Sequence, residues 1–310
     1  MRRHGLKIDE TAEVMELGYV DVPNFGDALN PYIFDHYLPD SFDGQSEEVL
    51  MGIGSILGFD EFEEAPKKIV FSSGYAPGYA SPPTIDQSYE VFCVRGPLTA
   101  RELDLKPELA VTDGAGLLRF MDHEPVETAY RYTYIPHKST EKLYHWQRVC
   151  QETGINYVSP ESGVEHVLRE IRRSEVVLAE AMHGAIVADT FRIPWVPVVT
   201  NARINEFKWR DWAASLNMEY SPQRIPSIYQ RSHIEEGLRY RLDSLLPDMG
   251  VRAASSAVSL WYNSTTRNRV YMAFEELKEI EPRLSSQNVF DDKTSRLREV
   301  IYHLGGKYLG

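Results

Sequence analysis

The sequence predicts an α/β protein built on parallel sheets, and three observations support this. Short β-branched runs alternate with helical segments from residue 19 to residue 199. Small or polar residues follow several of these runs, where a strand would turn into a helix. After residue 221 the strand patterns fade and helical spacing takes over. We therefore expect two α/β domains, residues 1–127 and 128–220, with a helical tail over residues 221–310 that packs on them.

The composition narrows the class of function. The 310 residues carry 46 acidic and 33 Lys and Arg side chains, a formal charge of −13, which disfavours general nucleic-acid binding. An anionic small ligand would need a local cluster of cations set against this field. The two cysteines, Cys93 and Cys150, do not suggest a disulfide framework. Residues 1–10 are basic with no apolar run behind them, so we expect a cytoplasmic protein.

The first unit shows a series of strand patterns joined by short turns. They lie at residues 19–22, 49–58, 68–74, 91–94 and 109–112. Helical segments are expected at residues 28–37 and 97–103, with Pro97 at the first helical position. Gly52, Gly54 and Gly58 miss the GxGxxG spacing, so we predict no dinucleotide fingerprint.

Two turns of this unit carry candidate functional residues. Asp27 follows Gly26 and is placed to cap the helix after it, or to meet a ligand. Arg95 ends the strand at 91–94 beside a helix N-terminus, where two positive features favour an anion. The alternatives are a simple capping residue and a surface salt bridge.

A polar, acidic segment at residues 121–130 reads as a linker to the second unit. Strand patterns follow at residues 132–135, 156–158, 176–179 and 193–199, with helices expected at 141–153 and 164–173. His137 lies in the turn that leaves the first of these strands. His183 and Gly184 lie in the turn after the strand at 176–179, where an open α/β sheet binds its ligands. A histidine that merely fills a turn is the alternative.

The remaining segments are helical by pattern. Residues 201–216 carry Trp209 and Trp212 three apart, beside Lys208, and an amphipathic helix packed by its tryptophans explains them. Further helical spacing lies at residues 234–246, 270–280 and 297–304.

Five short motifs, taken in order, resemble the polysaccharide pyruvyl transferase family over residues 18–217. They are Asn24-Phe25-Gly26-Asp27, Arg95-Gly96-Pro97-Leu98-Thr99, Asp113-Gly114, His183-Gly184-Ala185, and Lys208 ahead of Trp212 and Leu216. The chain is most similar to the exopolysaccharide branch that forms pyruvate ketals, such as enzymes of succinoglycan and xanthan synthesis. It departs from many members at Ala181-Met182, where they carry Arg-Leu.

The resemblance implies two Rossmann-like domains that face each other across a cleft, as in GT-B glycosyltransferases. It also implies phosphoenolpyruvate as donor, with no cofactor and no metal, and a sugar hydroxyl pair as acceptor. A lipid-linked oligosaccharide acceptor would bring the protein to the inner face of the membrane, beside glycan-assembly machinery.

The donor's chemistry suggests roles for the matched residues. Arg95 would grip one anionic group bidentately, with Lys208 as a second charge. His183 would act as the acid or the leaving-group partner, and Asp27 would orient or deprotonate the attacking hydroxyl. His137 and Gly184 are further donor-binding candidates, and Asn24 and Asp113 join Asp27 as acceptor-binding candidates.

Two other classes of function stay open on the sequence. One is a GT-B glycosyltransferase that uses a nucleotide sugar, in which Arg95 and Lys208 clamp a diphosphate. The other is a catalytically inactive glycan-binding protein of a polysaccharide assembly complex. The presence of Arg95, His183 and Lys208 together argues against the inactive protein, because a scaffold needs no such set.

Overall fold

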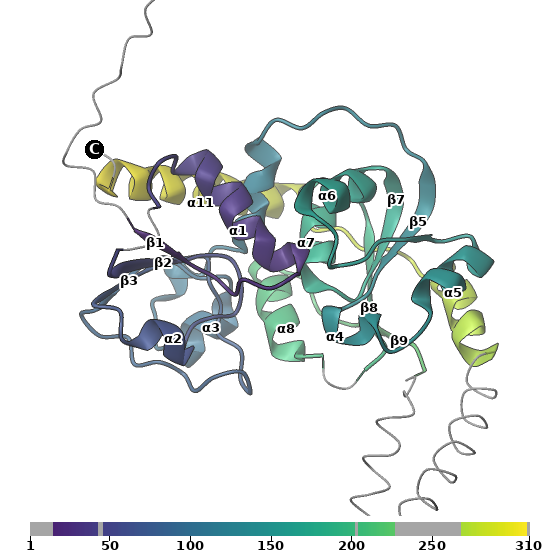
Figure 1. The fold of residues 1–310 in the computed structure, drawn as a ribbon, viewed down its shortest axis with the longest axis horizontal. Helices are drawn as coiled ribbons and strands as arrows, with labels where there is room; N and C mark the ends of the chain where they lie inside the picture. Colours follow the sequence, from purple (N-terminus) through teal and green to yellow (C-terminus); the bar gives the residue numbers. More distant parts are fainter. Residues whose placement is uncertain (1–14, 43–45, 202–203, 227–267, 309–310) are drawn as a thin grey trace, which may run out of the picture.

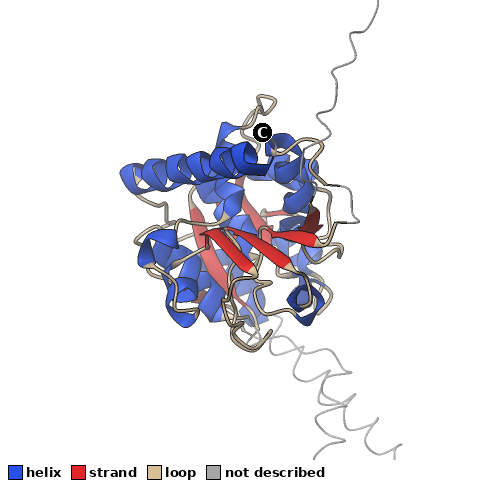
Figure 2. Cartoon of the chain, turned by 90° about the vertical axis from the view of Figure 1, so that its left-hand side faces the viewer, coloured by secondary structure: helices blue, strands red, loops and turns tan. Residues whose placement is uncertain are grey.

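The computed structural model describes residues 15–42, 46–201, 204–226 and 268–308. Their strands form two parallel sheets, one ordered β1-β2-β3-β4 and the other β6-β5-β7-β8-β9. Helices α1, α7 and α8 lie between the two sheets in Figure 1. Figure 2 shows the strands in the interior with helices around them. The predicted α/β class with parallel sheets is confirmed.

The first sheet begins earlier in the chain than the sequence predicted. Its strands are β1 (Glu16–Gly18), β2 (Glu48–Met51), β3 (Lys67–Phe71) and β4 (Tyr89–Cys93). The strand expected at residues 19–22 lies three residues earlier, at residues 16–18. Glu16 to Gly18 pair with β2, and the chain then leaves the sheet. The strand expected at 109–112 is also wrong: there Ala110 makes only a single bridge to Val94.

Four of the five strands of the second sheet were predicted, whereas β9 was not, because only helices were expected after residue 221. Its strands are β5 (Tyr130–Ile135), β6 (Asn156–Tyr157), β7 (Ser174–Ala179), β8 (Trp195–Val199) and β9 (Gln223–Arg224). Every pairing is parallel, so the carboxyl ends of these strands share one edge. That edge positions the turns that carry His137 and His183.

The helices connect and cover these strands. They are α1 (Phe25–Tyr37), α2 (Asp60–Glu63), α3 (Pro97–Glu102), α4 (Lys138–Glu141), α5 (Trp146–Thr153), α6 (Val164–Arg172), α7 (Met182–Thr190), α8 (Glu206–Ser215) and α11 (Gln287–Tyr308), with 3₁₀ turns η1 (Pro107–Leu109) and η2 (Gly114–Phe120). The helix predicted at 141–153 starts only at Trp146, since residues 142–145 form a turn. Helix α1 begins at Phe25 with Asn24 as its N-cap, so Asp27 lies in the first turn instead of capping it.

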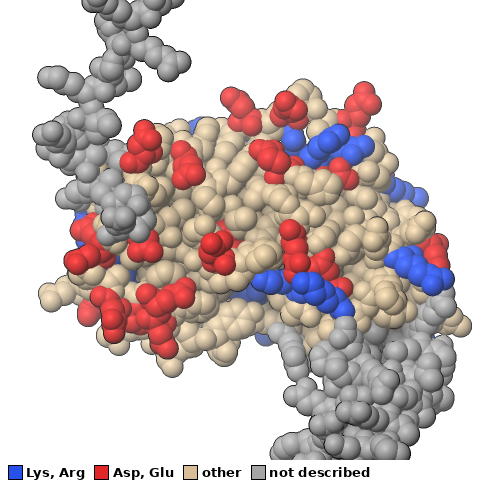
Figure 3. All heavy atoms as spheres, viewed as in Figure 1, with Lys and Arg blue, Asp and Glu red and all other residues tan. Residues whose placement is uncertain are grey.

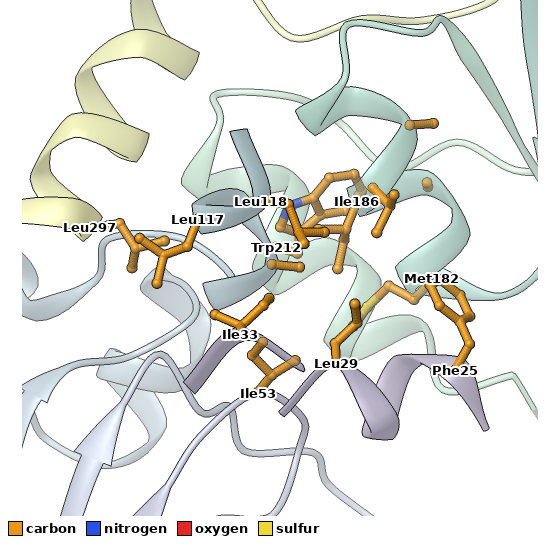
Figure 4. Close-up of a cluster of buried hydrophobic side chains, with 14 of the residues drawn as sticks. Phe25, Leu29, Ile33, Ile53, Leu117, Leu118, Met182, Ile186, Trp212 and Leu297 are labelled. Atoms are coloured by element: carbon orange, nitrogen blue, oxygen red, sulfur yellow. The ribbon is translucent and has the colours of Figure 1, made fainter. Parts of the chain in front are cut away.

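A shared hydrophobic core holds the helices between the sheets. Leu29 and Ile33 of α1, Ile186 of α7 and Trp212 of α8 belong to one buried cluster, drawn in Figure 4. Leu297 of α11 joins it, so the chain's last described helix closes the same core. Burial of these large apolar side chains supplies most of the folding free energy.

The remaining predicted segments have mixed outcomes. Residues 268–277 are helical and pack Val270, Phe274 and Leu277 against the second sheet's core. The helix predicted at 234–246 lies outside the described residues. The domain limits 1–127, 128–220 and 221–310, and the GT-B-like facing of two domains, stay predictions.

The surface reflects the acidic composition. On the face shown in Figure 3, Asp and Glu lie over both sheets, whereas most of the visible Lys and Arg gather on the side of the second sheet. Both cysteines are buried and unpaired. Across the described ranges, no helix has the length and apolar character that crossing a membrane requires.

Candidate functional site

A cavity of about 290 Å³ lies where the turns of the two sheets meet. Its walls come from the segments that follow β1, β2, β3, β5 and β7 and from the start of α8, so it opens at the carboxyl ends of parallel strands. The lining residues are Val20, Asn24, Phe25, Asp27, Gly54, Ser55, Ile56, Phe59, Tyr79, His137, Lys138, Ala181, Met182, His183 and Lys208. Five of the predicted site residues therefore share one cavity: Asn24, Asp27, His137, His183 and Lys208.

His183 lies in the first turn of α7, at the back of this cavity. Ala181 is the N-cap and provides no side-chain cap; the Gly184 amide donates to the Ala181 carbonyl at 2.9 Å, and the Met182 and His183 amides before it have no intrahelical acceptor. The imidazole is 12% exposed, meets the Phe25 ring edge-on at 6.4 Å, and has its Nε2 3.7 Å from Asp113 Oδ2. The side chain is thus held by its neighbours and reaches the cavity along one edge.

Gly26 of α1 leaves room for this imidazole. A β-carbon at Gly26 would lie only 2.2 Å from His183 Nδ1, far closer than any van der Waals contact allows. The first helix of one unit can therefore approach the histidine of the other only with glycine here.

Lys208 brings a positive charge to the cavity from the first half of α8. Its Nζ lies 5.5 Å from the centre of the Tyr79 ring. Burial and the nearby Arg95 lower the pKa of Lys208 to about 8, although Asp27 acts in the opposite direction. Among the described residues no carboxylate forms an ion pair with Lys208, so its charge is available to a ligand.

His137 and Lys138 extend the basic wall at the end of β5. The Ser139 amide donates to His137 Nδ1 over 3.2 Å, which leaves Nε2 as the proton-bearing nitrogen. Burial, followed by the charges of Lys208 and Lys138, lowers the pKa of His137 to about 3. His137 is therefore a neutral hydrogen-bond donor at physiological pH.

Asp27 faces this basic wall from α1. Asn24 Nδ2 donates to Asp27 Oδ2 over 2.6 Å, which fixes the carboxylate at the start of the helix. The other carboxylate oxygen has no hydrogen bond to a described residue. Asp27 can thus accept a proton or a hydroxyl hydrogen bond.

Arg95 lies outside the cavity, contrary to the direct anion contact predicted from the sequence. Its side chain is fully buried and donates to Asp211 Oδ2 at 3.1 Å, to the Tyr75 carbonyl at 3.2 Å and to Ser55 Oγ at 2.6 Å. Because Ser55 lines the cavity, the guanidinium supports the wall from behind.

Asp113 and Gly184 also lie behind the cavity. Asp113 Oδ1 accepts from the Ala115 amide at 3.0 Å and caps η2, and its side chain is fully buried. Burial would raise the pKa of Asp113, but His183, the Ala115 amide and Arg95 outweigh it and hold this pKa below the usual range. Gly184 packs against Ile135 of β5, with 3.3 Å between the position of a β-carbon and Cδ1.

Two buried carboxylates that the sequence analysis passed over organise the turns. Glu180 accepts from the amides of His137 at 3.0 Å and Thr200 at 2.8 Å, so it ties the ends of β5 and β8 to β7. Asp211 accepts from the Leu98 and Thr99 amides, both at 2.9 Å, at the start of α3. Two sequence patterns could have indicated these buried acids: Glu180 interrupts the apolar run 176–182, and Asp211 lies between Trp209 and Trp212.

The arrangement suits binding and protonation of a small anion. Lys138, Lys208 and the start of α7 supply positive potential, His137 supplies a donor, and His183 and Asp27 supply groups that exchange protons. Within the described part of the chain, no group of three or more His, Cys, Asp or Glu side chains is placed to hold a metal ion.

Comparison with known proteins gives two findings. The family model described as polysaccharide pyruvyl transferase matches residues 116–202, which include β5 to β8, His137 and His183. The succinoglycan biosynthesis protein ExoV of Rhizobium meliloti (strain 1021) is 36% identical over 220 residues, covering 70% of this chain and 69% of that protein.

Proposed function

Since the chain belongs to the polysaccharide pyruvyl transferase family, we propose that it moves the pyruvyl group of phosphoenolpyruvate onto a pair of sugar hydroxyls. The product would be a pyruvate ketal on an exopolysaccharide or another cell-surface glycan. The observation that carries this proposal is the cavity: Lys138, Lys208, His137 and His183 converge there in a protein of net charge −13.

The donor fits the basic wall of the cavity. Phosphoenolpyruvate carries a carboxylate and a phosphate, and charge-assisted hydrogen bonds from Lys208 and Lys138 would hold them. His137 Nε2–H and the Met182 and His183 amides at the start of α7 would complete the contacts. A cavity of about 290 Å³ is at the small end for ligand sites, which favours a three-carbon donor over a nucleotide sugar.

The acceptor fits the opposite wall. There the first unit presents Asn24, Asp27 and Ser55 for hydroxyl groups, beside the apolar side chains of Ile56 and Phe59. A sugar ring has both kinds of surface, polar at its hydroxyls and apolar at its C–H face. In this arrangement Asp27 would accept the proton of the attacking hydroxyl.

The reaction balances with these groups alone. One sugar hydroxyl adds to C2 of the donor while C3 takes a proton and becomes a methyl group. The second hydroxyl then forms its bond to C2 as the C2–O bond to phosphate breaks. Two hydroxyl protons are released, one equivalent to the proton gained at C3 and one to the departing phosphate. His183 would supply protons and Asp27 would receive them.

The site of action follows from the acceptor. A lipid-linked oligosaccharide would be presented at the inner face of the membrane, so the protein would work in the cytoplasm or associate peripherally with that face. The glycan-assembly machinery is the partner expected there.

Phosphate release tests the proposal directly. The protein is incubated with phosphoenolpyruvate and either lipid-linked oligosaccharides or simple nitrophenyl glycosides, and ketal formation is followed by mass. We expect phosphate and ketal in equal amounts, and thermal stabilisation by phosphoenolpyruvate. Stabilisation by UDP- or GDP-sugars in its place would favour the glycosyltransferase, and no turnover with any donor would favour the inactive binding protein.

A further inference from the structure

Two buried polar atoms face each other behind the cavity with no other hydrogen-bond partner among the described residues. They are Asp113 Oδ2 and His183 Nε2, 3.7 Å apart. We propose that Asp113 is the positioning residue of His183: it accepts a hydrogen bond from Nε2–H and so leaves Nδ1 as the nitrogen that meets the substrates. The role of His183 as proton donor, and only that part, rests on the proposed function.

The carboxylate is fixed before it meets the histidine. Asp113 Oδ1 accepts from the Ala115 amide at the start of η2, and the side chain has no exposed surface. One oxygen therefore has a structural task, and the other points at the imidazole. A buried carboxylate beside one ring nitrogen favours the tautomer that carries its proton there, and it also stabilises the imidazolium.

No side chain fills the space beside Nδ1, because residue 26 is glycine. A β-carbon at this position would lie 2.2 Å from Nδ1, where it would cover that nitrogen. Nε2 is buried, so the exposed part of the imidazole lies away from Asp113. The other charged groups around this ring are Asp27 of α1, Lys138 of α4 and Lys208 of α8, which line the same cavity, and Arg95 behind Asp113.

The pair joins the two units of the chain. Asp113 follows the single bridge between Ala110 and Val94 at the end of the first sheet. His183 lies in the first turn of α7, the helix that follows β7 of the second sheet. A change in the separation of the two sheets would therefore change the Nε2 to Oδ2 distance. With the contact made, neutral His183 accepts at Nδ1 and protonated His183 donates there, while Asp113 remains ionised throughout.

Nitrogen-15 NMR of the histidine rings in the full chain tests the tautomer without any substrate. For His183, assigned by comparison with His183→Gln, we expect the Nε2–H tautomer. In Asp113→Asn the amide would donate to Nε2, so the proton should move to Nδ1. The same variant should lose turnover by roughly 10²–10⁴-fold, while KM for phosphoenolpyruvate stays within about threefold because the donor-binding cations are untouched.

Asp189→Asn is a matched control. Asp189 lies on the same helix as His183 and is as deeply buried as Asp113. It accepts hydrogen bonds from Trp195 Nε1 and the Ser285 amide, away from the cavity. This variant should lower the melting temperature without changing the His183 resonances or turnover per folded molecule.

The outcomes separate this proposal from the proposed function. An Nδ1–H tautomer in the unaltered protein would overturn the positioning role, and this measurement decides even if Asp113→Asn fails to fold. Unchanged tautomer and turnover in a folded Asp113→Asn would overturn it as well. An Nε2–H tautomer in a protein that never uses phosphoenolpyruvate would uphold Asp113 and reject the pyruvyltransferase.

Discussion

The turn after β4 and the turn after β7 have similar secondary structure around them but different neighbours. A buried carboxylate covers the first, and a cavity lies beside the second. Each follows a parallel strand and leads into a short helix; Arg95 lies in the first of these turns, and His183 lies in the first turn of the helix that follows the second. At the first turn, the Asp211 carboxylate pairs with Arg95 and accepts the free amides of α3. At the second, α7 has no side-chain cap and His183 lines an open cavity.

The difference shows what makes such a turn a site. Strand order brings both turns to the carboxyl ends of their sheets, but a third element decides whether the positive end of the helix stays available. Where α8 inserts a carboxylate, the turn becomes a structural joint; where nothing is inserted, it can bind a ligand. Four substitutions can break or sharpen this comparison.

The largest effect is expected at the open turn. His183→Ala should lower turnover by roughly 10²–10⁴-fold, the usual range for a lost general acid. The melting temperature should also fall somewhat, since Oδ2 of buried Asp113 loses the imidazole that faces it, so turnover is expressed per folded molecule. Steady-state kinetics beside a melting curve measures both. Near-normal turnover in a folded variant would remove His183 from the chemistry.

The next effect is expected at the closed turn, and on stability. Arg95→Ala should lower the free energy of unfolding by about 3–5 kcal/mol, because Asp211 is left buried and unpaired. Urea denaturation measures the change.

Arg101→Ala is the control for this substitution, since it breaks only an exposed pair with Glu102 and should cost at most about 1 kcal/mol. If Arg95→Ala instead kept its stability and lost affinity for phosphoenolpyruvate, the direct donor contact predicted from the sequence would be upheld.

A smaller effect is expected where the two units meet. Gly26→Ala would push the His183 ring from its place, so turnover should fall by roughly 10–10²-fold. Gly306→Ala is the matched control: it lies in α11 with nothing within 4 Å of an added β-carbon, and it should gain up to about 1 kcal/mol of stability. Equal turnover in the two alanine variants would show that the contact at Gly26 has no bearing on the site.

The smallest effect concerns pH. Lys208, with its pKa near 8, is cationic at pH 7 and loses its charge as the pH rises, so donor affinity should fall by roughly two- to fivefold between pH 7 and pH 9. Lys208→Arg should flatten this dependence, and His137→Gln should keep it, because His137 is already neutral throughout that range. Calorimetric titration gives the dissociation constants. An unchanged slope in Lys208→Arg would assign the titration to another group.

The same shift affects the unliganded protein in the opposite sense. The pKa of Lys208 is lower in the folded chain than in the unfolded chain, so the unfolded state binds more protons between about pH 8 and 10.5. Lys208 therefore makes stability rise with pH across that window.

The sequence predicted where strands and turns lie along the chain better than which distant residues contact them. The strand pattern at 176–179 and the His183-Gly184 pair after it were recognisable because β-branched residues and a following helix are local signals. The partner of Arg95 was not, since Asp211 lies 116 residues further along the chain. The contact of Asp113 with His183 was not predicted either, because the Asp113-Gly114 motif carries no information about a residue 70 positions further along the chain.

Boundaries failed where pairing overrode propensity. The valines at 20 and 22 favour a strand, yet the register with β2 takes residues 16–18 and sends Val20 to the cavity wall. Residues 109–112 were apolar enough for a strand, but they pair at only one position before η2 begins.

The Arg95–Asp211 joint also bears on how the chain is assembled and on how it can be divided. During synthesis, the Arg95 guanidinium and the amides at the start of α3 have no partner until Asp211, 116 residues after Arg95, has been made. The core of the same region closes only when α11 arrives. The first sheet is therefore not an exchangeable building block, and a chimaera that replaces it must carry α8 and α11 from the same parent.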